Sequence, residues 1–268
     1  MARQVGVVKY NGTIGDIRHF KIKGLSGNYA GLKGGASASQ IKNDPAFKRT
    51  RENMNEFGGC AMVGKSIRSG QAQLLKQMSD PQLTGRLTGI VKKINLEDKT
   101  EARGYRAILI SQVPQYLIGL NFNKNRSFER IFFAPFELTA NADRNVVTLN
   151  MEDFNPMNYV NAPNGATHFR LINSISVISD YAYNSETGSY EPIDAGLNEM
   201  GNVVYSDYIA LNSTGMGSGS IENSLPGLPT MNENVSLLAC VGIEFHQKIG
   251  ENHYLLNEGN CLKIQDIF

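Results

Sequence analysis

One segment of the sequence has the residue types and spacing of a phosphate-binding loop. Gly59-Cys-Ala-Met-Val-Gly-Lys65-Ser66 matches the pattern Gly-x4-Gly-Lys-Ser, in which backbone N–H groups bind phosphates, the lysine reaches the outer phosphates and the serine binds magnesium. Such a loop follows a buried apolar strand, whereas residues 49–57 are largely charged or polar and have helical character. We therefore expect a helix that bends at Gly58-Gly59 and a solvated Lys65, with a nucleotide-binding enzyme as a third-ranked alternative.

The histidines and cysteines offer the other chemistry-bearing side chains. His246 and His253 flank an expected hairpin and could approach each other, but no Asp or Cys stands at ligand spacing from them. Cys240 or Cys261 with His246 has the residue types of a thiol nucleophile pair, yet Cys240 falls within an alternating strand pattern that predicts a buried side chain. We predict no catalytic residues, no metal site and no cofactor, and therefore a protein that is not an enzyme.

The distribution of charge is the strongest signal. Residues 1–106 hold 19 Lys and Arg against 8 Asp and Glu, a net charge of +11, while the rest holds 7 against 17, a net charge of −10, so the total is +1. Such asymmetry predicts that the basic part binds a polyanion or the acidic part of another copy. The residues predicted to make this contact are Lys21, Lys23, Lys33, Arg49, Arg51, Lys65, Arg68, Lys92 and Lys93.

These residues must be positioned by two kinds of element. Residues 1–36 predict a glycine-rich β-arm, with a hairpin that turns at Asn11-Gly12 and too few large side chains to form its own core. Residues 37–106 predict a basic helical subdomain of about three helices. One helix should begin at Asn43 or Asp44 with Pro45 in its first turn, and apolar stripes should run along residues 63–78 and 83–94.

Residues 107–268 alternate between apolar and polar positions, as strands do. Residues 136–140 should pair with 147–151, further strands should cover 168–181 and 235–245, and a last hairpin should turn at 257–260. The expected fold class is therefore α+β, with a C-terminal antiparallel β-sandwich of immunoglobulin or fibronectin type. By composition, Ser213–Ser220 is expected to be a flexible loop.

Composition excludes several classes of protein. Three cysteines are too few and too scattered for a disulfide scaffold. No apolar run approaches the roughly 18 to 20 residues of a membrane-spanning helix, and the first residues lack the pattern of a signal peptide. We therefore expect a cytoplasmic protein without a membrane span, although its release as part of an assembly stays open.

Several short motifs resemble a family of uncharacterised proteins of Bacteroidota. They are Gly12-Thr-Ile-Gly-Asp16, Lys33-Gly-Gly35, the run from Asp44 to Asn53, and Glu56-Phe-Gly58. The resemblance extends over most of the chain and implies a bacterial protein with a single-family architecture. It implies no activity and no catalytic residues, and it makes the phosphate-loop match an accident of sequence.

These observations favour a structural protein that assembles with copies of itself as a filament, tube or shell subunit. The arm would pair with a neighbour's strand edge while the basic face meets the acidic sandwich. The alternative is a nucleic-acid-binding protein that uses the basic helices, and an acidic protein surface is a further candidate partner.

Overall fold

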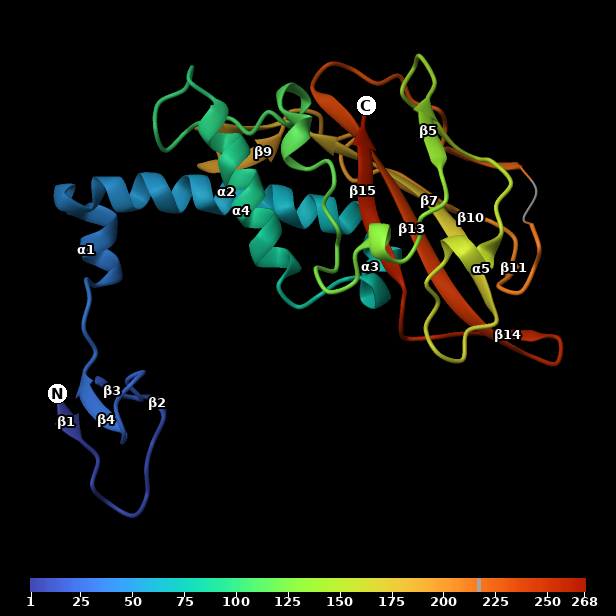
Figure 1. The fold of residues 1–268 in the computed structure, drawn as a ribbon. Coiled ribbons are helices and arrows are strands. Elements are labelled where there is room, and N and C mark those ends of the chain that lie inside the picture. Colours follow the sequence, from blue (N-terminus) through green and yellow to red (C-terminus); the bar gives the residue numbers. More distant parts are fainter. Residues whose placement is uncertain (216–217) are drawn as a thin grey trace. The chain divides into compact units, whose positions relative to one another are not determined.

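The computed structural model describes residues 1–215 and 218–268, and the chain divides into two compact units, residues 1–51 and residues 52–268. The expected boundaries after residues 36 and 106 stay a prediction. The expected flexible loop at Ser213–Ser220 includes residues 216 and 217, which lie outside the described part of the chain. Figure 1 shows the order of the elements along the chain.

The first unit contains a four-stranded antiparallel sheet in the order β1-β4-β3-β2. Its elements are β1 (Ala2–Arg3), β2 (Gly12–Ile14), β3 (Ile17–Phe20), β4 (Tyr29–Leu32), α1 (Ala38–Asn43) and a 3₁₀ turn, η1 (Pro45–Phe47). The predicted hairpin turn at Asn11-Gly12 is wrong, because the turn falls between Ile14 and Ile17, where Gly15 adopts a φ of 57°. The Gln4 side chain, which bonds both backbone groups of Tyr10, instead closes residues 5–9 into a loop.

Three helices follow, as predicted: α2 (Lys48–Gly70), α3 (Ala72–Met78) and α4 (Leu83–Glu97). The predicted start signal is confirmed for η1, which leads into α2, because the Asp44 side chain accepts a hydrogen bond of 2.8 Å from the Ala46 N–H and Pro45 occupies the first turn. The predicted bend at Gly58-Gly59 is wrong, since α2 continues through both residues. Gly59 instead allows close packing, because a Cβ there would lie 2.5 Å from Cγ of Tyr190.

The large antiparallel sheet has the order β10-β7-β13-β14, with β11 on β7 and β15 on β13. Its strands are β7 (His168–Ser179), β10 (Gly201–Tyr205), β11 (Ile209–Ala210), β13 (Val235–Ile249), β14 (Asn252–Leu255) and β15 (Cys261–Ile267). The predicted final hairpin is wrong. Both β14 and β15 pair with β13, which at 15 residues is long enough to accept them one after the other.

A smaller sheet, β12-β6-β5, consists of β5 (Phe136–Ala140), β6 (Val146–Met151) and β12 (Gly219–Ser224). The predicted pairing is confirmed, because Phe136, Leu138 and Ala140 lie opposite Met151, Leu149 and Val147. The remaining elements are a two-stranded ribbon and short helices: β8 (Tyr181–Asn184), β9 (Ser189–Pro192), η2 (Ile110–Gln112), η3 (Pro114–Tyr116), η4 (Phe128–Arg130) and α5 (Pro156–Tyr159).

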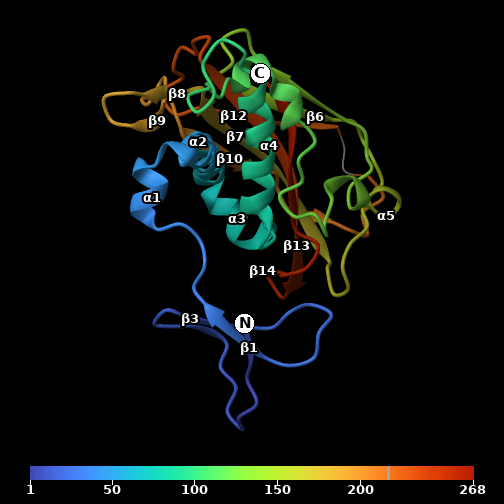
Figure 2. The same ribbon diagram turned by 90° about the vertical axis from the view of Figure 1, so that its left-hand side faces the viewer.

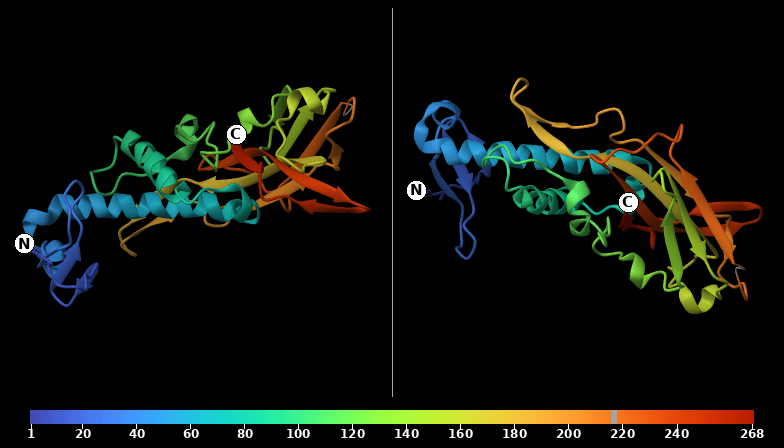
Figure 3. Two further views of the ribbon diagram at one scale, coloured as in Figure 1. Left: turned by 60° about the horizontal axis from the view of Figure 1, so that its bottom comes forward. Right: turned by 90° about the horizontal axis from the view of Figure 1, so that it is seen from above.

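The large sheet of the second unit is covered on both faces. Leu238 and Cys240 of β13 pack with the apolar residues of α2, α3 and α4, whereas Val241 and Ile243 pack on the other face with Leu149 of β6. The ribbons of the three helices are seen in front of the large sheet in Figure 2, and the strands of the two sheets are seen in Figure 3. This double coverage explains why β7 and β13 are buried along nearly their whole length. The fold is therefore a mixture of helices and antiparallel sheets, as the sequence predicted.

Candidate functional site

The first unit concentrates positive charge and exposes its apolar side chains. Residues 1–51 carry 10 Lys and Arg against 2 Asp, a net charge of +8, and residues 52–268 carry 16 against 23 acidic residues, a net charge of −7. No residue from 1 to 51, a range that the structure describes completely, is buried. Large apolar side chains are exposed instead, among them Val5, Val7, Val8, Ile14, Leu25 and Leu32. The unit thus combines a basic surface with unburied apolar side chains.

Five of the predicted contact residues belong to this unit, and they differ in their surroundings. Lys21, Lys23 and Lys33 are exposed, and Arg49 is exposed in the first turn of α2. Arg51 is turned back on its own unit, because its guanidinium donates to the carbonyls of Ile41 at 2.7 Å and Asp44 at 2.9 Å. The three lysines are therefore the better candidates for contact with a partner.

The other four predicted residues belong to the second unit, and only two of them are exposed. Lys65 and Lys93 are exposed, whereas Arg68 is half-buried. Lys92 pairs with the buried carboxylate of Glu56 and donates to Oδ1 of Asn95 at 2.7 Å. Lys92 therefore belongs to the interior network around Glu56, which the charge pattern alone did not reveal.

Glu56 is the centre of this network and is 2% exposed. Besides Lys92, it accepts a hydrogen bond of 2.7 Å from the Gly104 N–H and lies 3.8 Å from the Arg106 guanidinium. Burial acts to raise the pKa of Glu56, but these partners outweigh burial and hold the pKa below its ordinary value. The network ties the loop after α4 to α2, so we assign it a structural role.

The segment that matches a phosphate-binding loop is helical throughout, as its flanking residues predicted. Because Gly59–Ser66 lies inside α2, its backbone N–H groups belong to the helix and form no phosphate cradle. Ser66, whose counterpart in a phosphate-binding loop binds magnesium, is buried, and its hydroxyl lies 2.7 Å from the Tyr181 hydroxyl and 2.6 Å from Oε1 of Glu199. The segment cannot bind a nucleotide in this conformation.

Three histidines that are far apart in sequence meet around Tyr208. The His253 ring stacks on Tyr208 at 3.9 Å, the His246 ring lies 4.9 Å from Tyr208, and the His168 ring lies 4.8 Å from His253. The rings contact one another by faces and edges, and the described residues include no group of three or more His, Cys, Asp or Glu placed to hold a metal ion. His246 and His168 are opposite each other on β13 and β7, a register that could not be read from the sequence.

The three cysteines are buried and unpaired, and two of them lie on opposite faces of the large sheet. Cys240 packs in the core beneath the helices, and Cys261 packs in the core beneath the small sheet. Burial raises the pKa of Cys60 and of Cys261 to about 12, so neither thiol ionises near neutral pH. A cysteine nucleophile is therefore unsupported.

This burial predicts the outcome of a thiol titration. At pH 7.5 an aromatic disulfide reagent should modify none of the three cysteines in the native chain, because they are neither exposed nor ionised. After unfolding in guanidinium chloride, all three should react within minutes. Rapid reaction of one thiol in the native protein would show that at least one of the three cysteines is not buried.

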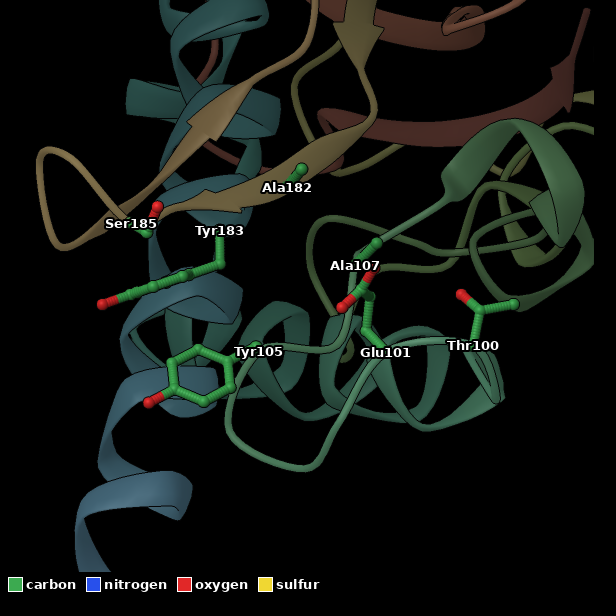
Figure 4. A pocket seen from close by; sticks show the side chains of 7 residues that line it. All are labelled: Thr100, Glu101, Tyr105, Ala107, Ala182, Tyr183 and Ser185. Carbon is green, nitrogen blue, oxygen red and sulfur yellow. The ribbon is translucent and has the colours of Figure 1, made fainter.

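A cavity of about 550 Å³ lies beside the β8–β9 ribbon, and Figure 4 shows its lining. The rings of Tyr105 and Tyr183 are 4.8 Å apart at its wall, and Glu101 supplies a carboxylate. The residues described as lining it are Thr100, Glu101, Tyr105, Ala107, Ala182, Tyr183 and Ser185. These lining residues include no histidine, cysteine or lysine, and the Thr100 hydroxyl donates a hydrogen bond of 2.7 Å to Oδ1 of Asp98.

Comparison of the chain with protein-family models, with curated proteins and with solved structures found no match. The resemblance to a Bacteroidota family therefore stays a prediction. None of the helices in the described part of the chain is long and apolar enough to cross a membrane. Any conclusion about function thus depends on the charges and surfaces described above.

Proposed function

We propose that this chain is a non-enzymatic structural protein that assembles with copies of itself and uses residues 1–51 as the connector. The observation that carries the proposal is that none of these residues, every one of which the structure describes, is buried. A folded unit gains most of its stability by removing apolar surface from water. A unit with exposed Val5, Val7, Leu25 and Leu32 gains that stability when a partner covers it.

The net charges of the two units support a second copy as the partner. The connector carries +8 and residues 52–268 carry −7, so the connector of one copy is attracted to the larger unit of another. Contacts between two different surfaces of the same chain are heterologous. They produce filaments or tubes when they stay open and rings or shells when they close.

The first test is the size of the nuclease-treated full-length protein at low and high salt. We expect light scattering and negative-stain microscopy to show regular particles or filaments, and a chain that begins at Ser37 to be monomeric. The truncated chain should keep its urea midpoint, because the clusters of buried apolar residues lie within residues 52–268. A full-length monomer at every salt concentration would contradict the proposal.

The same purification tests the nucleic-acid alternative, which the exposed Lys65 of α2 and Lys93 of α4 support. Bound nucleic acid would co-purify with the untreated protein, and its affinity would fall by orders of magnitude between roughly 50 and 200 mM salt. Particles that persist after nuclease treatment favour self-assembly instead.

We also propose residues 107–268 as an antiparallel sandwich of immunoglobulin or fibronectin type. The packing of Leu149 and Met151 of the small sheet against Phe169 and Val241 of the large sheet supports this class. An experimental structure with the same strand order as either family would establish it.

A further inference from the structure

Strand β5 is an open edge of the small sheet. In the part of the chain that the structure describes, β5 pairs with β6 alone. The Asn141 N–H donates to the carbonyl of Val146 at 3.0 Å. Because hydrogen-bonded pairs alternate along an antiparallel ladder, Thr139 and Glu137 also bond to β6, whereas the N–H and C=O groups of Leu138 and Ala140 point away from it. This edge can accept another strand.

The outer face of the same sheet is acidic. Glu137 on β5 and Glu222 on β12 are exposed, and Glu152, just after β6, is exposed as well. The three strands contain no Lys or Arg, and the sequence has none between Arg144 and Arg170. The face therefore attracts a basic partner.

A hollow of about 390 Å³ lies where β5 begins. Phe136 and Met151 give it an apolar lining, and Glu137 and Glu152 add carboxylates; Pro135 and Asn150 complete it. A hollow of this kind suits an aliphatic side chain with basic residues around it.

We propose that the β5 edge and this acidic face receive residues 1–51 of a second copy of the chain. The inference rests on the proposed function, and it names the surface that the connector binds. The connector has the complementary charge of +8, and its strand β2 is itself an edge strand that pairs with β3 alone among the described residues. Ile14 on β2 is 57% exposed, which makes it available to the hollow. Pairing of β2 with β5 would extend the sheet from one copy into the next.

A proline substitution tests the strand pairing in the full-length chain. Ala140→Pro removes an N–H that points away from β6, so the fold should tolerate it while addition of another strand is blocked. We expect Ala140→Pro to abolish assembly, and the matched Ala140→Ser to assemble like the unchanged chain. Both variants should keep the urea midpoint of the unchanged chain, which separates loss of assembly from loss of folding.

Reversal of charge on the two surfaces tests the choice of partner. The acceptor variant carries Glu137→Lys and Glu222→Lys, and the connector variant carries Lys21→Glu, Lys23→Glu and Lys33→Glu. Each variant alone should fail to assemble, because the acceptor variant then has two positive surfaces, and the three substitutions of the connector variant lower the net charge of its connector from +8 to +2. An equimolar mixture should form heterodimers, because the unchanged connector of the acceptor variant can bind the unchanged acceptor surface of the connector variant.

The outcomes distinguish this inference from the proposed function. If Ala140→Pro and the acceptor variant assemble like the unchanged chain while the chain that begins at Ser37 does not, the connector role stands and the β5 site is wrong. If the mixture of the acceptor variant and the connector variant stays monomeric, the β5 site is also wrong. If the unchanged chain is a monomer, both proposals fail.

Discussion

Lys92→Met should lower the free energy of unfolding by about 3 kcal/mol, because it leaves the buried carboxylate of Glu56 without its closest cation. Methionine keeps most of the length of the lysine stem, so the loss is mainly electrostatic. The neighbouring Lys93→Met is the matched control. Lys93 is exposed, and its replacement should change the free energy of unfolding by no more than about 0.5 kcal/mol. Urea denaturation at pH 7 measures both values.

The effect of Lys92→Met on the free energy of unfolding should also depend on pH, which gives a second measurement. The pKa of Glu56 lies below its ordinary value in the folded chain, so the carboxylate adds stability at pH values above its pKa in the unfolded chain. That stability is lost as the pH falls through the lower, folded pKa. The difference in free energy of unfolding between the unchanged chain and Lys92→Met should therefore become smaller on acidification below about pH 4. A difference that stays constant down to pH 3 would contradict a role for the ion pair.

Gly59→Ala should destabilise the chain by about 2 kcal/mol, although alanine is the better helix former. The added methyl group would lie 2.5 to 2.8 Å from three atoms of the buried Tyr190 ring, so the ring or the helix must shift. Gly58→Ala is the control one residue earlier in the same helix, where a Cβ meets no atom within 4 Å. It should stabilise the chain by about 0.5 to 1 kcal/mol.

A double-mutant cycle shows whether Tyr190 causes the effect. In a Tyr190→Leu background the smaller side chain leaves space at Gly59, so Gly59→Ala should cost much less than in the unchanged chain. The urea midpoints of the unchanged chain, the two single variants and the double variant give the coupling between residues 59 and 190. If Gly58→Ala and Gly59→Ala change the midpoint in the same direction and by the same amount, the packing of Tyr190 on α2 is not as described.

Local patterns in the sequence predicted the elements whose structure depends on neighbouring residues. The Asp44-Pro45 start of a helical turn, the register of β5 with β6 and the long strand β13 all follow from caps and alternation over a few residues. The same patterns predicted that the Gly59–Ser66 segment is helical.

Several features that the sequence did not predict depend on residues far away along the chain. Gly59 resembles a hinge until Tyr190, 131 residues later, is known to pack on it. Lys92 was predicted to contact a partner, and its pairing with Glu56 is known only once Glu56 is placed beside it on another helix. The histidines meet around Tyr208 because β7 pairs with β13, and no spacing in the sequence specifies that register.

The place of β13 in the sequence also affects how the chain folds during synthesis. Helix α4 ends at Glu97, but β13, against which the helices pack, does not begin until Val235. At 5–20 residues per second, a ribosome needs roughly 7 to 28 s to make the intervening stretch. During this time the apolar stripes of α2, α3 and α4 lack the strand that buries them, and nascent chains should therefore be substrates for chaperones that bind apolar segments.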